Sequence, residues 1–339
     1  MKTMENLLRL LFYFISFFYF LVLCVFALAP YWPEEIWWLA NVLQPLPLWP
    51  LGIPAAFFSL LALVTRDRGG IVVAVSSALI LLFGVMGFQG PWPRQFLGTE
   101  PPRYTLRVMT INLGGKVDLP ALLKLIKEEN PDIIAFQEAS SISQSFLSHT
   151  GLPDSQWDMH LDKQLGLASR FEIVNFKSLD RRMIGRWEGF VGRYELKGPH
   201  GPIQFFNVHL ETPRRAIETL LWERRDGFKE MLLLTERQEK ESQAASQLAG
   251  ASPAAVLAGD FNMLQSSPVF RKYWSRWADA FAKAGRGFGY TKHTRWHGAR
   301  IDHVLYDPDS WMVQRVRVGP DLGGDHRPVI ADLAFRERP

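Results

Sequence analysis

Side chains able to hold a metal ion or move a proton stand repeatedly at the ends of short apolar stretches in the C-terminal two thirds of this sequence. They are Asn112, Glu138, His209, Asp260, Asn262, Asp302, Asp325 and His326. A single carboxylate at such a place is more often part of a turn or a helix cap than of an active site. Because the placement recurs, we expect these side chains to lie along one edge of a sheet, where a rigid frame can position a site.

The elements that must position these side chains alternate between β-type runs and helical patterns. Strands are expected at residues 106–112, 132–138, 172–176, 190–196, 203–209, 255–260, 301–306, 312–318 and 329–333. A helix is expected to begin at Asp118 and to end before Pro131, and a longer helix with regular apolar spacing is expected over residues 216–247. This alternation predicts a layered α/β domain, although the pattern does not determine the order of the strands.

Six short blocks of this region occur in a characteristic order. They are TINLGG, FQE, NVHLET, GDFN, IDHVLY and GGDHRP. This series resembles the endonuclease/exonuclease/phosphatase superfamily, which has the DNase I-like fold, and GLASRF at residues 166–171 is similar to a further block of that family. One block alone is a weak signal, whereas six in the same order are specific. The resemblance covers residues 105–335 and implies a four-layer α/β sandwich with phosphoesterase activity.

Hydrolysis of a phosphate ester requires a cation that neutralises the phosphoryl oxygens and activates water, together with a base for that water. The only cysteine, Cys24, lies far from this region, so a thiolate metal site and a disulfide are excluded there. Hard oxygen ligands favour Mg²⁺ or Mn²⁺. Glu138 is the first candidate ligand, helped by the amide oxygen of Asn112, and the resemblance implies the same two positions. Asp325 is a further candidate.

The resemblance implies roles for the other polar residues. Asp260 would orient and deprotonate the attacking water, Asn262 would donate a hydrogen bond to the phosphate, and His209 would stabilise the phosphoryl charge or assist the leaving group. Asp302 would pair with His326, fixing its tautomer and favouring an imidazolium that contacts the phosphate.

The stretch GGDHRPVIADL at residues 323–333 is then explained as the glycine turn that brings Asp325 and His326 to this site. His303 follows Asp302 in the same strand, so we expect it to point to the opposite face. It is interpreted as a satisfied core residue, not as part of the site.

Three uncharged stretches precede this domain, at residues 10–29, 46–65 and 70–88. The first is long enough to cross a hydrocarbon core of about 30 Å as a helix, and the simplest count is three transmembrane helices. Prolines in the first half of the second stretch indicate a helix that begins late or is kinked. If that stretch does not cross, the domain lies in the cytoplasm. A cleaved signal peptide is the alternative for the first stretch, but its length and the following Pro30 argue against cleavage.

Basic residues flank the first stretch and separate the second from the third, whereas the loop at residues 30–45 carries no Lys or Arg. The positive-inside rule therefore places the N-terminus and the Arg66 turn in the cytoplasm, and three crossings place the domain outside it. Five tryptophans near the span ends fit an interfacial aromatic belt, or equally well ordinary loop and core positions. They are Trp32, Trp37, Trp38, Trp49 and Trp92.

The chain is accordingly divided into a membrane anchor at residues 1–94, a tether at 95–104 and a catalytic domain at 105–339. Residues 95–339 carry 33 basic and 30 acidic side chains, which is too balanced for a dedicated nucleic-acid binder. We therefore expect a membrane-anchored phosphoesterase that acts on lipid or small phosphorylated substrates. An extracytoplasmic nuclease is the alternative, because the blocks do not distinguish the two kinds of diester. A non-catalytic binding module is disfavoured by the complete set of site residues.

Overall fold

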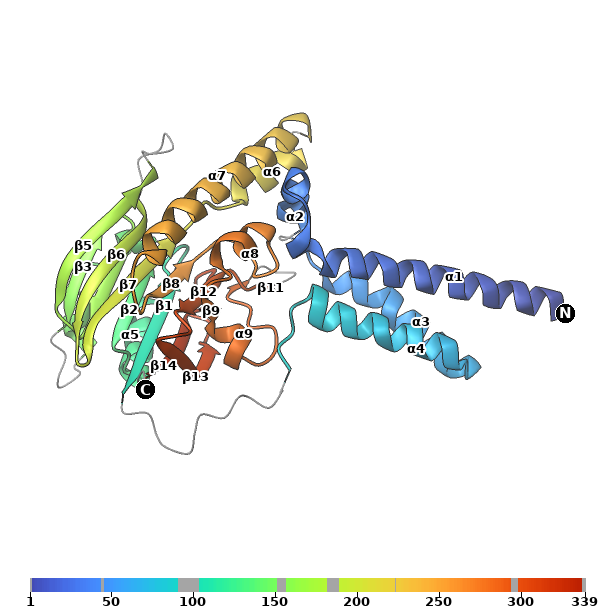
Figure 1. The fold of residues 1–339 in the computed structure, drawn as a ribbon, viewed down its shortest axis with the longest axis horizontal. Coiled ribbons are helices and arrows are strands. Elements are labelled where there is room, and N and C mark those ends of the chain that lie inside the picture. Colours follow the sequence, from blue (N-terminus) through green and yellow to red (C-terminus); the bar gives the residue numbers. More distant parts are fainter. Residues whose placement is uncertain are drawn as a thin grey trace.

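The computed structural model describes residues 2–43, 46–90, 104–150, 157–181, 189–222, 224–293 and 298–336. It places a bundle of N-terminal helices at one end of a domain built on two β-sheets (Figure 1). The expected tether at residues 95–104 lies outside the described residues except for Tyr104, and so does Trp92.

The first sheet has the strand order β13-β14-β1-β2-β4-β3. Its strands are β1 (Thr105–Asn112), β2 (Ile133–Gln137), β3 (Asp158–Asp162), β4 (Leu165–Ser169), β13 (Trp311–Val318) and β14 (Val329–Phe335). Because β1 is parallel to β2 and antiparallel to β14, the ends of β1 and β2 reach the same edge as the start of β14. That edge carries Asn112, Glu138 and the turn that precedes β14.

The second sheet has the strand order β5-β6-β7-β8-β12-β9. Its strands are β5 (Ile173–Asp180), β6 (Gly189–Gly198), β7 (Gly201–His209), β8 (Val256–Asp260), β9 (Ala278–Asp279) and β12 (Asp302–Tyr306). β7 is parallel to β8, and β12 runs antiparallel to it. The register aligns His209 with Asp260 and Asp260 with Asp302, so three of the predicted site residues form one row.

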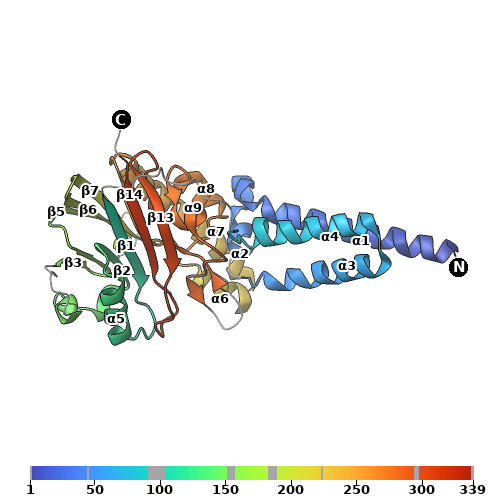
Figure 2. The ribbon, with the colours of Figure 1, turned by 90° about the horizontal axis from the view of Figure 1, so that it is seen from below.

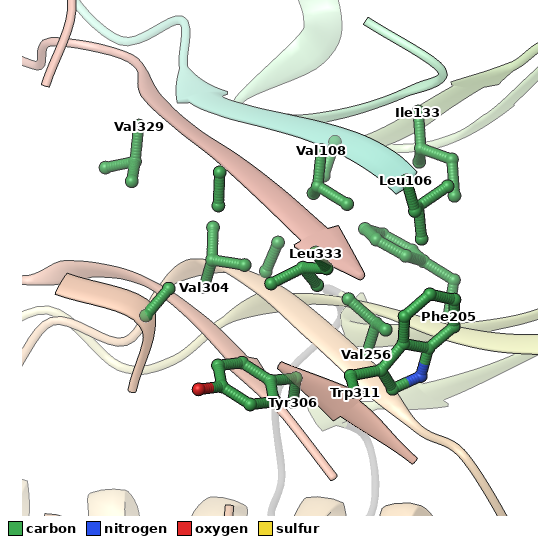
Figure 3. Close-up of a cluster of buried hydrophobic side chains, with 14 of the residues drawn as sticks. Leu106, Val108, Ile133, Phe205, Val256, Val304, Tyr306, Trp311, Val329 and Leu333 are labelled. Atoms are coloured by element: carbon green, nitrogen blue, oxygen red, sulfur yellow. The ribbon is translucent and has the colours of Figure 1, made fainter. Parts of the chain in front are cut away.

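The two sheets pack face to face. Figure 3 shows this core, in which Val108 and Leu333 of the first sheet meet Phe205, Val256 and Val304 of the second. A second apolar cluster joins the outer face of the second sheet to α7 (Arg224–Gly250) and α8 (Pro268–Trp274), and a third joins the outer face of the first sheet to α5 (Leu119–Glu129). The order helix, sheet, sheet, helix is the expected four-layer α/β sandwich.

Local signals explain where α5 begins and ends. The carboxylate of Asp118 accepts a hydrogen bond from the backbone N–H of Ala121 at 3.1 Å, and Asn130 closes the helix in the left-handed conformation before Pro131. Both boundaries agree with the sequence prediction. The strands β3 and β4 and the short helices α8 and α9 (Ala280–Ala284) were not predicted. β4 reads LGLAS, whose small residues have low strand propensity, and its pairing with β2 and β3 determines its conformation.

The single long helix expected over residues 216–247 is wrong. Two helices, α6 (Arg214–Trp222) and α7, pack against each other around Ala216, Met231 and Leu234. Their approach is close, because a Cβ at Gly227 would lie 2.2 Å from the Cα of Leu220. Part of the apolar pattern that suggested one continuous helix is buried between the two helices, whereas Leu221, Phe228 and Leu232 stay exposed.

The N-terminal bundle contains α1 (Lys2–Ala27), α3 (Gly52–Thr65) and α4 (Arg68–Leu79), which continues as a π-helical segment at Ile80–Val85. Figures 1 and 2 both show the three helices side by side. Within the described residues, Asn6–Ala27 and Arg68–Val85 are long and apolar enough to cross a membrane, which alone is a weak indication of a span. The span expected at residues 46–65 is not confirmed, because the helical stretch Trp49–Thr65 is shorter and, as its prolines predict, begins late.

The loop between the first two apolar stretches docks on the domain, which the sequence did not predict. It forms short 3-10 turns at Ala29–Tyr31 and Glu34–Ile36 and then α2 (Trp37–Leu43). Trp37 is 5% exposed and packs in the apolar cluster beneath α7 and α8. Asn41 donates a hydrogen bond to Thr235 at 2.8 Å. Trp37 is therefore a core residue of the domain and not part of an interfacial belt.

The C-terminal end of the anchor also contacts the domain. Gln89 and Gly287 exchange two backbone hydrogen bonds of 2.8 and 2.9 Å, and the rings of Phe88 and Phe288 meet edge to face at 5.1 Å. The domain is thus docked on the bundle at two places, independently of the segment between residues 90 and 104.

Candidate active site

The predicted site residues meet where the two sheets present the ends of their central strands. Asn112 is the last residue of β1 and Glu138 follows β2 directly. The side chain of Asn112 connects the sheets, because its Nδ2 donates to Glu138 Oε1 at 3.1 Å and to Asp260 Oδ2 at 3.0 Å. Glu138 has φ 51°, a left-handed conformation that is uncommon for a side-chain-bearing residue and is often found at functional sites.

His326 is almost fully buried between two carboxylates. Its Nδ1 lies 2.9 Å from Asp302 Oδ2, and its Nε2 lies 3.7 Å from Asp260 Oδ2. Burial works against the charged imidazole, but the negative charges of Asp302 and Asp260 outweigh it and raise the pKa of His326 to about 9. The structure thus joins Asp302 to His326, as the sequence predicted.

Asp260 is buried at the centre of the group. Burial and the neighbouring charge of Asp302 raise its pKa to about 6, against the opposing effects of His326 and of hydrogen bonds from Asn262 and Asn112. The backbone N–H of Asn262 donates to Asp260 Oδ1 at 2.8 Å, and the side-chain Nδ2 of Asn262 donates to the carbonyl of Leu210 at 2.9 Å. One amide hydrogen of Asn262 is therefore engaged by the backbone within the described part of the chain.

His209 lies at the side of the group, with its Nε2 3.9 Å from Glu138 Oε1. Burial, followed by the positive charges of Arg181 and His326, lowers its pKa to about 3, so its imidazole is neutral. Its Nδ1 is buried and has no hydrogen-bond partner within the described part of the chain. The backbone carbonyl of His209 accepts from Arg181 at 2.8 Å, and Arg181 in turn contacts the buried Glu241 at 2.7 Å.

The glycine turn before β14 carries Asp325 and His326 to the rim, as predicted. There they contact two cationic side chains that the sequence did not predict. Gly323 has φ 82°, a conformation that favours glycine. Asp325 Oδ2 accepts from Lys292 Nζ at 2.7 Å and from Arg214 Nη2 at 3.2 Å. Lys292 Nζ also lies 2.8 Å from Nε2 of His326. Partial burial raises the pKa of Asp325, but Lys292 foremost, then the charges of His326 and Arg214, keep it below its usual value.

Sequence reasoning missed Lys292 and Arg214 as members of the site. Lys292 lies in TKH, a block without a recognisable spacing, and Arg214 begins a helix whose basic residues resemble an ordinary solvated face. Only the backbone bridge between Lys292 and His326 brings the ammonium group to the rim. His303, by contrast, points away as expected, with its two ring nitrogens against Asp279 at 2.7 Å and the carbonyl of Met263 at 3.1 Å.

The donor set fits a divalent cation on the Glu138 side of the site. The Glu138 side chain is 45% exposed, and within the described residues its Oε2 takes no hydrogen bond. Gly114 leaves the space beside this oxygen free, since a Cβ there would lie 2.6 Å from it. The amide oxygen of Asn112 accepts from the N–H of Gly114 at 2.8 Å, so metal binding through that oxygen requires the amide to turn. Among the described residues, Asp260, Asp302 and His326 also lie close enough to share an ion, but Asp302 already hydrogen-bonds His326, and Asp260 accepts from Asn112 and Asn262.

Two packed sheets with carboxylates, imidazoles and a lysine at one rim define the architecture of a metal-dependent phosphoesterase. The chain belongs to the Endonuclease/Exonuclease/phosphatase family, whose sequence model matches residues 109–326. Members of this family act on phosphate esters and are typically dependent on divalent metals. The protein is therefore an enzyme, a metal-dependent hydrolase of phosphate ester bonds, as the sequence predicted.

Similar solved structures support the fold. An endonuclease/exonuclease/phosphatase from Beutenbergia cavernae DSM 12333 has 20% identity and a TM-score of 0.52, over 69% of this chain and 72% of that one. A family protein from Leptotrichia buccalis C-1013-b has 14% identity and a TM-score of 0.52, over 68% of this chain and 100% of that one. A D. rerio TDP2 humanized by 14 mutations has 12% identity and a TM-score of 0.52, over 68% and 98%. No curated protein sequence matches this chain.

Proposed function

We propose that this protein is a membrane-anchored phosphoesterase that uses Mg²⁺ or Mn²⁺ to hydrolyse phosphate esters or diesters of lipid or small phosphorylated substrates. The observation that carries the proposal is the continuous series of contacts from Glu138 through Asn112 and Asp260 to His326 and Asp302. It supports a rim that combines an exposed oxygen ligand, a buried base and a cationic imidazole. Each of these groups has a separate task in phosphoryl transfer.

Glu138 would hold the cation, joined by Asn112 once its amide has turned its oxygen toward the ion. The bound cation neutralises phosphoryl charge and activates water. Asp260 acts as the general base, because burial brings its pKa to about 6, close to the operating pH, while it stays deprotonated at neutral pH. The second amide hydrogen of Asn262, adjacent to Asp260, donates to a phosphate oxygen.

The phosphate would lie between Lys292 and His326. Lys292 Nζ lies 2.8 Å from His326 Nε2, a hydrogen bond when the imidazole is neutral; once His326 is protonated, two positive donors face each other at this separation and repel. A phosphate oxygen accepts from both and so removes this conflict. Asp325 lies beside Lys292 and Arg214, so it is better placed to hold these cations at the phosphate than to bind the metal, its predicted role. His209 is neutral and donates to the phosphoryl group or the leaving oxygen.

We also propose that α1, α3 and α4 all cross the bilayer. α3 packs along α4 in the same bundle, and several of its apolar side chains are exposed as they would be to lipid, among them Ile53, Leu60 and Val64 at 62%, 64% and 73%. The Arg66 turn lies at the end of the bundle far from the domain, where the N-terminus also lies (Figure 2). Three crossings would put the domain outside the cytoplasm.

The preference for lipid substrates is supported by the placement of α6. Its first residue, Arg214, contacts Asp325 at the site, and its last residue, Trp222, is 84% exposed next to Leu221. The tip of the α6 and α7 pair lies beside α2 at the bundle end of the domain in both views (Figures 1 and 2), and Trp38 contacts Phe228 there at 4.7 Å. A headgroup at the bilayer surface would therefore be near one end of a helix that begins at the site.

The alternative function is an extracytoplasmic nuclease on the same fold, which the near balance of charge in residues 95–339 disfavours. The full-length protein in detergent micelles with Mg²⁺ should be tested on sphingomyelin, phosphatidylinositol phosphates, DNA and RNA. We expect turnover of a lipid headgroup ester that exceeds turnover of either nucleic acid. Cleavage of DNA or RNA alone would replace the lipid proposal by the nuclease, and no turnover of any phosphate ester by wild type and Asp260→Ala alike would favour a binding module.

The proposed topology has its own test. In intact cells, a protease added from outside should digest the C-terminal domain, whereas the same protease added to the outside of sealed inverted vesicles should leave the domain whole. Protection of the domain in intact cells would show that one of the three helices does not cross.

A further inference from the structure

A large cavity lies between the bundle and the domain, away from the candidate active site. Its volume is about 940 Å³, which is within the range of sites for small ligands. One wall is formed by the domain-side ends of the anchor, including Trp49 and the segment at residues 83–87. The opposite wall is formed by α8, α9 and the strand β11 (Gly298–Ala299). If the bundle crosses a bilayer, this cavity lies at the level of the lipid headgroups.

Four basic side chains line the cavity, namely Arg271, Arg276, Lys283 and Arg300. Within the described residues, Arg271, Arg276 and Lys283 form no ion pair with a carboxylate; Arg271 instead lies 4.0 Å from the ring centre of Tyr31 of the anchor. The acidic residue of the lining, Asp279, is buried and already engaged by His303 at 2.7 Å. The cavity therefore has an excess of positive charge that the protein does not balance.

Arg300 provides a separate indication of a ligand. Its side chain is 9% exposed, and its Nη2 donates to Gln265 at 3.0 Å. Its Nη1 is buried without a hydrogen-bond partner and lies 3.9 Å from Asp279 Oδ1. A buried guanidinium N–H without an acceptor is costly. Because Nη1 itself is closed off from solvent and faces Asp279, an anionic oxygen in the cavity would supply the missing acceptor once the guanidinium turns toward it.

The cavity is distinct from the catalytic rim because β12 separates them. Asp302 points to the rim, whereas the next residue, His303, points to the other face and contacts Asp279 of the cavity wall. A ligand in the cavity would therefore not occupy the phosphate position between Lys292 and His326. Aromatic side chains at the cavity, including Tyr31 and Trp49, are of the kind found at the interface of a membrane.

We propose that this cavity binds the phosphate headgroup of an anionic phospholipid, with Arg276, Lys283 and Arg300 as its phosphate-binding groups. The lipid occupies the seam between anchor and domain and fixes the domain on the bilayer surface. Basic pockets at the end of a transmembrane bundle are suited to such headgroups. The proposal rests on the bundle lying in a membrane, and it does not depend on the substrate of the catalytic rim.

The test is lipid retention by the delipidated full-length protein, measured by native mass spectrometry. The protein in mild detergent is incubated with equal amounts of phosphatidylglycerol and phosphatidylcholine of the same acyl chains. We expect selective retention of phosphatidylglycerol, and a loss of about fivefold for each charge removed in Arg276→Gln/Lys283→Gln. Both residues are at the surface of the fold, so their substitution should leave the unfolding temperature unchanged. The matched control is Lys124→Gln/Lys127→Gln on α5, on the far side of the domain (Figure 1).

Each result of this experiment either supports or contradicts lipid binding in the cavity. Selective retention that falls in the cavity variant and persists in the control supports the proposal. Equal retention of the two lipids, or selectivity that is the same in the cavity variant, contradicts it. A parallel incubation adds inorganic phosphate in tenfold excess over lipid. If inorganic phosphate displaces phosphatidylglycerol completely, the cavity is a site for free phosphate and the lipid is not its occupant. The experiment measures lipid retention and not catalytic turnover. A negative result would therefore contradict the lipid site without contradicting the proposed hydrolase activity.

Discussion

Charged side chains gather in two regions of this protein, the catalytic rim and the cavity beside the anchor, and the two differ in burial and pairing. At the rim, Asp260, Asp302 and His326 are almost fully buried and contact one another. At the cavity, Arg276 and Lys283 are exposed and lack carboxylate partners within the described residues. Buried, mutually paired charges have fixed positions and shifted pKa values, as catalysis requires. Exposed, like-charged groups suit the collection of an anion from the surroundings.

The largest expected effect is at the buried base of the rim. Replacing Asp260 by Asn removes the proton acceptor but keeps the shape and the hydrogen bond with Asn262. We expect kcat to fall by about 10²- to 10⁴-fold, the usual contribution of a general base. The measurement is turnover of the preferred phosphate ester in Mg²⁺, with the exposed Asp309→Asn as the control. An Asp260→Asn variant with at least a third of wild-type kcat would remove Asp260 from the chemistry.

The buried ion pair of Glu241 and Arg181, which contacts the backbone of His209 at the rim, should contribute more to stability than an exposed ion pair does. Glu241 is fully buried, and it accepts hydrogen bonds from Arg181 and from the N–H of Glu211. Glu241→Ala leaves the Arg181 guanidinium buried without its main partner, so the free energy of unfolding should fall by about 3–5 kcal/mol. The control is Glu236→Ala in an exposed pair with Lys240, expected to cost less than about 1 kcal/mol. Chemical denaturation of both variants tests this, and equal losses would contradict the difference.

The pH dependence of turnover should follow the ionisation of Asp260 and His326 at the rim and not of groups at the cavity. Asp260 must be deprotonated to accept a proton, so activity should rise as the pH passes about 6. His326 must be protonated to contact phosphate, so activity should fall as the pH passes about 9. The profile of kcat/KM against pH should therefore be bell-shaped between these values. In His326→Gln the fall at high pH should disappear, and its persistence would assign that limb to another group.

Contact of the domain with the bilayer should give the smallest effect. Trp222→Ser at the tip of α6 removes one exposed aromatic side chain, and turnover of a lipid substrate in vesicles should fall by about fivefold, equivalent to about 1 kcal/mol of interfacial binding. Turnover of a soluble phosphodiester should not change. Val174→Ser, another exposed apolar position on β5, is the control and should leave both activities unaltered. An equal loss on soluble and vesicle substrates would show that Trp222 acts on the fold and not on the bilayer.

The sequence was sufficient for the parts of the fold that depend on local signals. Asp118 and Asn130 give α5 its ends, and the strands that end in Asn112, His209 and Asp260 were recognised because polar residues directly follow apolar runs. The eight predicted site residues came from the same pattern together with the family resemblance. Their convergence depends on parallel pairing of β1 with β2 and of β7 with β8, which brings strand ends to one edge.

What the sequence did not predict depends on contacts between distant segments. Lys292 reaches His326 only because a backbone bridge joins the short strand β10 (Lys292–His293) to the turn before β14, and Trp37 is buried only because the anchor folds back on the domain. The helix predicted over residues 216–247 was misassigned, since an apolar face that packs on a neighbouring helix has the same spacing as one that packs on a sheet. No local pattern encodes these partners.

The most direct test of the central claim is the Mg²⁺ dependence of phosphate-ester hydrolysis by the wild type and by Glu138→Gln. We predict saturable activation by Mg²⁺ in the wild type, complete loss on chelation, and in Glu138→Gln at least about a tenfold higher Mg²⁺ requirement, because a carboxylate ligand has become a neutral amide. Hydrolysis that persists in excess chelator, or a Mg²⁺ requirement that Glu138→Gln leaves unchanged, would contradict a metal-dependent site at this rim.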